Sequence, residues 1–254
     1  MSPKTQKIGE TTVSAIGYGA MGISTAYGSV LLVGEQMKVL TSCVLVVGSE
    51  RSEVFRVTKF GMILGEPLPD GRRVCGDPEE AVKKLDESLA KLGVDHVDLW
   101  CLHRADKTVP IERTVAAMAE QVRAGKVRYL GLSEVSADTL RRAHAAHPIA
   151  ALQVEYSAFT LDIEDNKTGL LKTPRELGVE IVAYSPVGHG LVTGAINIME
   201  NMAAKLSVKE VEEIRTQVVH ADSTIGPRYP AALVELLLGD TPPLDQWSSN
   251  VRGS

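Results

Sequence analysis

A lysine near the end of a short apolar segment is the first residue of this sequence whose type and position could serve chemistry. The segment VFRVTKFG spans residues 54–61, and Lys59 is followed at once by Phe60 and Gly61. Lysine is rarely buried without a partner, because removing an unpaired ammonium from water is costly. The segment alone therefore favours a Lys59 that reaches solvent from the end of a strand. The alternative is a lysine that points into a site where a positive charge is needed.

Polar residues occupy the equivalent position in four later segments, at or near the C-terminal end of an apolar run. They are His103, Ser133 with Glu134, Gln153 with Tyr156, and Tyr184 with Ser185. The carboxyl ends of parallel strands meet at one edge of a sheet. This edge carries the chemistry in (β/α)8 barrels and the ligand in doubly wound sheets. We therefore expect these side chains to gather with Lys59 at one edge.

The elements that position these residues alternate regularly between residues 54 and 190. Predicted strands at 54–61, 97–103, 127–134, 151–157 and 179–190 alternate with predicted helices at 77–93, 111–125, 136–148 and 170–178. This order indicates βαβ units and a parallel sheet. The nearly continuous apolar strands indicate a sheet that is covered on both faces.

The first of these helices has the clearest boundaries. Asp77 is in place to cap its N-terminus, and Gly93 is in place to end it. Apolar residues at spacings of three and four predict a stripe that faces the sheet. The stripe comprises Val82, Leu85, Leu89 and Leu92.

The fold that fits this order of elements is a barrel. No G-x-G-x-x-G motif follows a strand, which weighs against the doubly wound dinucleotide-binding fold. Residues 11–23 predict a further short strand or hairpin, but only five strands are clear and at most seven can be counted. We therefore expect an α/β protein with a (β/α)8 TIM barrel that is incomplete.

Composition and charge narrow the class of protein. The chain has 254 residues, of which 44% are hydrophobic and 23% are charged, and its net charge is −5. These values are typical of a globular protein and give no reason to expect binding to nucleic acid or to an anionic membrane. The N-terminus lacks the apolar core of a signal peptide, and no stretch is apolar enough to cross a membrane. We therefore expect a soluble, cytoplasmic protein.

The spacing of cysteine and histidine predicts neither a disulfide framework nor a metal site. The three cysteines, Cys43, Cys75 and Cys101, lie far apart and form no CxxC motif. This usage suits a reducing compartment. No group of His, Asp and Glu has the spacing of metal ligands, so we expect no bound metal.

Seven segments, taken in order, carry a family resemblance. They read AIGYGAMGIS, VTKFG, LWCLHRAD, GKVRYLGLSEVS, LQVEYSAF, VEIVAYSPVGHGLVTG, and RYPAAL followed by DTPPL. Together they are similar to the aldo-keto reductase family, and most to its fungal and plant branch of NADP-dependent oxidoreductases. The resemblance covers residues 11–29 and 54–195, and it resumes over residues 197–244. It implies one barrel domain over residues 1–254, with its core at 54–195 and a C-terminal helix and tail at 196–254.

The resemblance implies a reaction, the reduction of aldehydes or ketones to alcohols by hydride transfer from NADPH. Lys59 matches the family's lysine, whose ammonium lowers the pKa of a tyrosine acid, and His103 matches the histidine that orients the carbonyl group. The implied partner is therefore a small carbonyl compound. Without the resemblance, His103 is more simply a strand-end histidine with satisfied hydrogen bonds, and Tyr184 is a packing residue.

The resemblance implies cofactor and substrate positions as well. Ser133 and Gln153 match residues that bind the nicotinamide carboxamide, and Tyr184 matches the aromatic residue on which the nicotinamide ring stacks. The residues expected along the pyrophosphate are Ser185, Val187 and Gly190. The residues expected to contact the substrate are Tyr27 and Trp100.

Two parts of the family's pattern are missing. The second strand normally carries an aspartate and the tyrosine acid in a stretch similar to DTADxYG, but residues 29–53 hold no aspartate and no tyrosine. After GLVTGA, the loop and last strand whose basic residues bind the 2′-phosphate of NADP are also missing. We therefore expect the second and last strands to be lost or replaced, and the binding of NADP to be weakened.

These gaps leave a second class of function open. Because general acid catalysis contributes about 10²–10⁴-fold to a rate, the alternative to an active reductase is a catalytically impaired family member. Such a chain would act as a binding or oligomerisation module, or it would be a poorly folded fragment.

Overall fold

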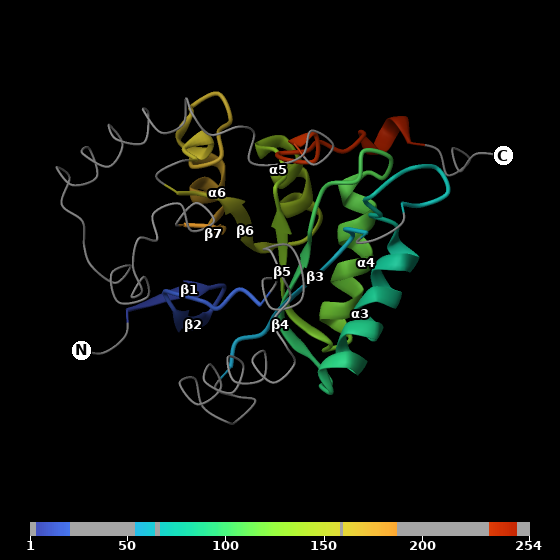
Figure 1. Cartoon of the computed structure of the whole chain (residues 1–254), viewed down its shortest axis with the longest axis horizontal. Coiled ribbons are helices and arrows are strands. Elements are labelled where there is room, and N and C mark those ends of the chain that lie inside the picture. Colours follow the sequence, from blue (N-terminus) through green and yellow to red (C-terminus); the bar gives the residue numbers. More distant parts are fainter. Residues whose placement is uncertain (1–3, 21–53, 64–66, 158–159, 187–233, 248–254) are drawn as a thin grey trace, which may run out of the picture. The chain divides into compact units, whose positions relative to one another are not determined.

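The computed structural model describes residues 4–20, 54–63, 67–157, 160–186 and 234–247 (Figure 1). The chain divides into two compact units, residues 1–56 and residues 57–254, and each is described by itself. The expectation of one domain over residues 1–254 stays a prediction. The segments in which the second and last strands are expected to be lost or replaced lie outside the described residues.

The described part of the first unit is a β-hairpin. Strand β1 (Thr5–Ile8) pairs antiparallel with β2 (Thr11–Ser14), and Gly9 turns the chain with a φ of 55°. Glycine suits this left-handed conformation because it has no Cβ to clash. The strand or hairpin predicted over residues 11–23 is confirmed for β2, whereas its partner β1 precedes the predicted segment.

Five parallel strands form the centre of the second unit. They are β3 (Val57–Phe60), β4 (Val97–Leu102), β5 (Val127–Ser133), β6 (Ile149–Glu155) and β7 (Glu180–Tyr184). Their order in the sheet is their order in the chain. This is the order of a (β/α)8 barrel, whereas a doubly wound sheet reverses its order at a switch point. All five predicted strands are confirmed.

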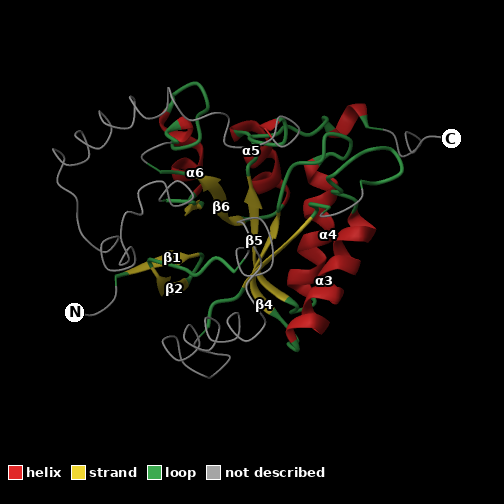
Figure 2. Ribbon diagram, viewed as in Figure 1, coloured by secondary structure: helices red, strands yellow, loops and turns green. Residues whose placement is uncertain are grey.

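Helices connect the strands and cover one face of the sheet (Figure 2). They are α3 (Pro78–Leu92), α4 (Ile111–Arg123), α5 (Ala137–Ala146) and α6 (Lys172–Leu177), with 3-10 turns η2 (Asp162–Glu164) and η4 (Leu244–Gln246). Neighbouring helices pack in chain order, α3 on α4, α4 on α5 and α5 on α6. All four predicted helices are confirmed. No helix in the described part of the chain has the length and apolar character needed to cross a bilayer.

Local chemistry sets both ends of α3. The Asp77 carboxylate accepts a hydrogen bond from the backbone N–H of Glu79 at 3.0 Å, which satisfies a donor that the helix itself leaves unpaired. Pro78 occupies the first turn, where its missing N–H is not needed. At the other end, Gly93 adopts a φ of 64° and closes the helix.

The apolar stripe of α3 differs from the prediction at two positions. The buried side chains Ala81, Leu85 and Leu89 form a single i, i+4 row, whereas Val82 and Leu92 lie off this row, Val82 half-buried and Leu92 50% exposed. The predicted burial of Leu92 is therefore wrong. Spacings of three and four admit more than one row of side chains, and packing against the sheet selects one of them.

The hydrophobic core lies between the helices and one face of the sheet. The strand residues that point into it include Phe60, Trp100, Leu102, Leu130, Leu132, Leu152 and Val154. The rings of Phe60 and Trp100 pack with their centroids 4.6 Å apart. Because side chains alternate along a strand, the residues between these positions point to the opposite face. That face carries Lys59 and Cys101.

Residues 234–247, the tail, are hydrogen-bonded to the carboxyl edge of the sheet. The Gly239 N–H donates to the carbonyl of Glu134 at 3.0 Å, and the Gly239 carbonyl accepts from the Ser136 N–H at 3.2 Å. On the helix side, Arg142 of α5 donates to two carbonyls of this tail at 2.9 and 2.7 Å. These contacts hold the tail against the end of β5.

Replacing Leu85 by Ala should lower the free energy of unfolding by about 2–5 kcal/mol, because the side chain is fully buried and its loss leaves a cavity. The matched control is Leu92→Ala in the same helix. It removes the same atoms from a half-exposed position and should change the free energy of unfolding by about 0.5 kcal/mol or less. Urea denaturation of both variants measures the difference, and equal losses would contradict the buried row assigned to α3.

Candidate active site

Strand register brings the two predicted catalytic residues to neighbouring strand ends. Lys59 on β3 lies beside Cys101 on β4, and Cys101 lies beside Gly131 on β5. His103 follows Cys101 by two positions, so alternation puts it on the same side of the sheet. Its N–H donates to the carbonyl of Phe60 at 2.8 Å, which ties the end of β4 to the end of β3.

Lys59 is a partly buried ammonium. Burial is the main cause that lowers its pKa; the Cys101 thiol, to the extent that it ionises, raises the pKa, and the Arg104 guanidinium lowers it. Among the described residues, the charged and titratable groups that act on Lys59 do not include a carboxylate. The ammonium therefore gives up its proton more readily than an exposed lysine does.

Cys101 is a neutral neighbour of Lys59 and not its counter-charge. Complete burial raises the pKa of this thiol to about 12, although the Lys59 ammonium acts to lower it. The thiol stays protonated at neutral pH and behaves as a small apolar group. Gly131 makes room for it, because a Cβ at that position would lie 2.6 Å from the Cys101 sulfur.

His103 is neutral in this environment. Burial lowers its pKa to about 4, and the positive charges of Arg104 and Lys59 act in the same direction. A neutral imidazole has one N–H donor and one nitrogen acceptor. The ring can therefore donate a hydrogen bond to a carbonyl oxygen without transferring a proton at neutral pH.

Arg104 is a site residue that sequence reasoning missed. It is only 8% exposed, and its Nη1 donates to the carbonyl of His103 at 2.8 Å and to the hydroxyl of Ser133 at 3.3 Å. Its charge acts on the pKa values of Lys59, His103 and Glu134. The available signal was a positive charge directly after a strand-end histidine, where an exposed loop residue is the simpler interpretation.

Ser133 and Gln153 lie opposite each other at the carboxyl ends of β5 and β6. Alternation places both on the same face as Lys59. Ser133 is buried, and because its oxygen accepts a hydrogen bond from Arg104, its own proton remains to be donated. A serine hydroxyl and a glutamine amide offer the donors and acceptors that a carboxamide needs. The donor set therefore fits a nicotinamide, and the assigned roles stay predictions.

The ends of β5 and β7 are joined by a tyrosine and a carboxylate. Tyr184 forms a hydrogen bond with the Glu134 side chain, and Glu134 also accepts the backbone N–H of Glu155 at 2.8 Å. Glu134 and Ser185 have φ values of 53° and 51°. This left-handed conformation is unfavourable for a residue with a Cβ, and such residues gather at functional sites.

Trp100 does not lie at this edge. It is 0% exposed and packs on Phe60 in the core, on the face of the sheet opposite Lys59. This burial corrects the prediction that Trp100 contacts the substrate. The run from Leu99 to Leu102 is continuously apolar, so the sequence gives no sign of which face each of its residues takes. The other predicted positions, Tyr27, Val187 and Gly190, lie outside the described residues.

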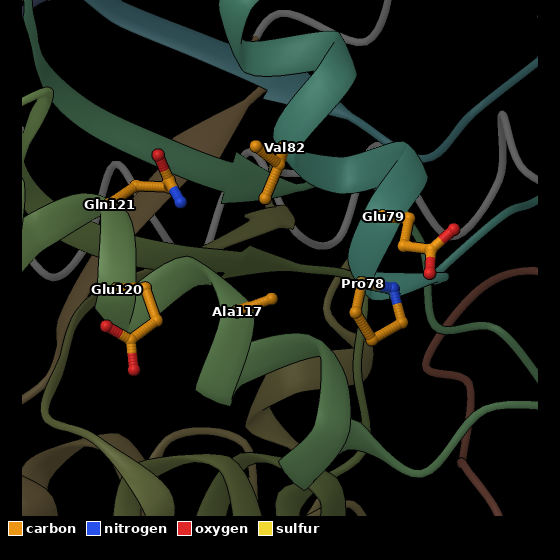
Figure 3. A pocket seen from close by; sticks show the side chains of 6 residues that line it. All are labelled: Pro78, Glu79, Val82, Ala117, Glu120 and Gln121. Carbon is orange, nitrogen blue, oxygen red and sulfur yellow. The ribbon is translucent and has the colours of Figure 1, made fainter.

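An open depression of about 450 Å³ lies away from the strand ends, between α3 and α4 (Figure 3). It is lined by Pro78, Glu79, Val82, Ala117, Glu120 and Gln121. Its lining is mainly apolar and includes none of the predicted site residues, so we assign it no chemistry. In the part of the chain that the structure describes, no three His, Cys, Asp or Glu side chains gather to hold a metal ion.

Comparison with known families adds a decisive observation. The model of the aldo/keto reductase family matches residues 9–236. The chain belongs to the aldo/keto reductase family. The resemblance predicted from the seven sequence segments is thereby confirmed.

Curated relatives come from fungi and from a plant. Aldo-keto reductase str7 of Strobilurus tenacellus is 50% identical over 218 residues, which cover 75% of this chain and 63% of the relative. Aldo-keto reductase yakc [NADP(+)] of Schizosaccharomyces pombe is 40% identical over 222 residues, which cover 77% of this chain and 64% of the relative. Probable aldo-keto reductase 1 of Glycine max is 38% identical over 221 residues, covering 78% and 62%. The matched part of the chain thus spans less than two thirds of the length of these relatives.

Solved structures show the fold. The thermostable aldo-keto reductase Tm1743 superposes with a TM-score of 0.68 at 22% identity, covering 84% of this chain and 99% of that one. Aldo-keto reductase AKR11C1 from Bacillus halodurans gives a TM-score of 0.63 at 21% identity, covering 76% and 70%. The predicted (β/α)8 barrel of aldo-keto reductase type is confirmed, and the five described strands are consecutive strands of it.

The lowered pKa of His103 should appear as a pH dependence of stability. A histidine whose folded pKa of about 4 lies below its ordinary 6.5 binds fewer protons in the folded state. Stability therefore falls as the pH drops through that window. Between pH 7 and pH 5 this should remove about 2 kcal/mol from the free energy of unfolding, and His103→Gln should abolish that part of the loss. Urea titrations at both pH values measure it. The same pH dependence in both proteins would contradict a buried neutral imidazole.

Proposed function

We propose that this chain reduces aldehydes or ketones to alcohols with NADPH. The observation that supports this most directly is the meeting of Lys59 and His103 at adjacent strand ends, next to the strand ends that carry Ser133 and Gln153. The relative from Schizosaccharomyces pombe carries NADP(+) in its name, which favours NADP(H) over NAD(H). The family's barrel places such residues at the rim where its chemistry is done.

The partner that this edge suits is a small carbonyl compound. His103 would donate a hydrogen bond to the carbonyl oxygen, and Lys59 would stabilise the negative charge that develops there during reduction. NADPH supplies the hydride when it is bound. Ser133 and Gln153 would hold the nicotinamide by its carboxamide, so that the ring faces the carbonyl carbon. The free thiols of Cys75 and Cys101 support a reducing, cytoplasmic setting.

The reduced oxygen must take up a proton to give the alcohol. The Cys101 thiol is a poor donor because its pKa is raised to about 12. The Lys59 ammonium is a better donor because burial lowers its pKa. We propose that an N–H bond of Lys59 breaks as the O–H bond of the alcohol forms, and that the resulting amine regains its proton from water.

A second candidate function is binding without efficient turnover. It is favoured by one observation, that no carboxylate acts on Lys59 among the described residues. Residues 29–53, where the family's pattern carries its aspartate and tyrosine, also hold neither residue type. In this case the edge would bind a nicotinamide nucleotide, and the chain would serve as a binding or oligomerisation module.

Thermal unfolding with and without NADPH tests the binding that both candidates share. A ligand that binds only the folded state adds about 2.7 kcal/mol of stability at a hundred times its dissociation constant. We therefore expect the unfolding transition to rise with NADPH concentration. A cooperative transition that NADPH leaves unchanged would remove the proposed nucleotide site.

Lys59→Met tests the catalytic assignment, because it keeps an apolar stem and removes the charge and the proton. We expect turnover of a nitrobenzaldehyde to fall by about 10²-fold or more. NADPH affinity should stay within about threefold, because Lys59 lies on β3 whereas the proposed nicotinamide contacts come from β5, β6 and β7. The matched control is Lys83→Met on the exposed side of α3, which should leave both unchanged. Turnover that survives in Lys59→Met would remove Lys59 from the mechanism, and NADPH binding without turnover in the wild type would favour the second candidate.

A further inference from the structure

Glu134 joins all the strand ends that are proposed to hold the nicotinamide. Its N–H donates to the carbonyl of Gln153 at 3.0 Å. Its carboxylate accepts the N–H of Glu155 at 2.8 Å and forms a hydrogen bond with Tyr184. Its own carbonyl accepts the N–H of Gly239 in the tail. Glu134, which directly follows β5, thus contacts β6, β7 and the tail.

The backbone of Glu134 directs its side chain to this place. A φ of 53° is unfavourable for a residue with a Cβ. The turn that it makes after β5 brings the carboxylate to the backbone of β6 and to the end of β7, as the bonds to Glu155 and Tyr184 show. A conformation of this kind persists only where surrounding contacts fix it.

The carboxylate is poorly exposed to water. Glu134 is buried, and a cavity of about 40 Å³ beside it is lined by the tail residues Leu237 and Leu238 and by the acidic residues Glu155 and Asp162, among others. Such a space admits few water molecules. Burial raises the pKa of Glu134, whereas the Glu155 N–H, the Arg104 guanidinium and the Tyr184 hydroxyl lower it and the Glu155 carboxylate raises it. When ionised, the charge is weakly screened and acts strongly on its neighbours.

We infer that the Glu134 carboxylate, acting through its hydrogen bond to Tyr184, raises the affinity of this site for the oxidised nicotinamide nucleotide relative to the reduced one. The inference rests on the proposed function, because it takes Tyr184 as the surface on which the ring stacks. The oxidised ring carries a positive charge that the reduced ring lacks. A phenol that donates its hydroxyl to a carboxylate has a more negative ring face, which attracts a cation.

The other charges at this edge of the sheet oppose the binding of a positively charged ring. Lys59 and Arg104 are both positive, and either would disfavour a cationic ring nearby. The Glu134 carboxylate, which Arg104 stabilises, opposes that repulsion. Glu134 is therefore a positioning residue: it holds Tyr184 and places a negative charge behind the ring.

Dissociation constants of both nucleotides test the inference without any need for turnover. NADPH is followed by its own fluorescence and NADP⁺ by displacement, at pH 8, because a higher pH favours the ionised form of a carboxyl group whose pKa is raised by burial. We expect Glu134→Gln, which keeps a hydrogen-bond acceptor, to weaken NADP⁺ about tenfold and NADPH less than about threefold. Tyr184→Phe keeps the ring and should weaken NADP⁺ selectively as well. The double variant should match Glu134→Gln, because the two residues act as one unit.

The matched control is Glu176→Gln, which removes a carboxylate of α6 that is paired with Arg141 of α5 on the helix side. It should leave the ratio of the two dissociation constants unchanged. Equal weakening of both nucleotides by Glu134→Gln, or an unchanged ratio, would overturn the inference and leave the proposed function standing. If Glu134→Gln does not unfold cooperatively, the ratio of the two dissociation constants in Tyr184→Phe takes its place as the test. A wild type that binds neither nucleotide would overturn the proposed function and this inference together.

Discussion

Alternation of side chains along parallel strands is the constraint on which both the core and the candidate site depend. On β4, Trp100 and Leu102 point to the helices, so Cys101 between them must point the other way. The same rule fixes Lys59 against Phe60 on β3. Burial of large apolar groups on the helix side thus determines which polar groups face the barrel interior. A shift of one residue in any strand would exchange core and site together.

Charge is the second feature that unites the site. Arg104 is buried, binds the Ser133 hydroxyl and acts on Lys59, His103 and Glu134 at once. Burial is the main cause that shifts the pKa of all three groups; the guanidinium adds to the lowering at Lys59 and His103 and acts against the raising at Glu134. One guanidinium therefore contributes to the pKa of three side chains on three strand ends. A change at Arg104 would alter several properties of the site, not one.

The sequence predicts what is local and repeated. Caps at Asp77 and Gly93 and the regular alternation of strands and helices are written in short segments, so the elements and their order can be predicted. The exposure of Leu92 and the direction of the Trp100 side chain cannot be predicted in this way. Spacing and composition do not show which row of helix side chains, or which face of a strand, packs against the neighbouring element. Arg104 was not identified as a site residue, and Glu134 was expected at this edge without an assigned role, because the roles of both come from contacts across strands. The left-handed φ of Glu134 in particular follows from those contacts and not from its residue type.

The unfavourable state of the buried basic groups bears on the choice between a reductase and a binding module. Burial lowers the pKa of both Lys59 and His103, so each opposes its own protonation in the folded protein. A methionine or a glutamine could fill the same space without removing an ionisable base from water. Binding a nucleotide through Ser133, Gln153 and Tyr184 requires neither group. In the reaction proposed above, one of these basic residues would donate a proton and the other would hold an oxygen, which would account for two such groups at adjacent strand ends at the expense of stability.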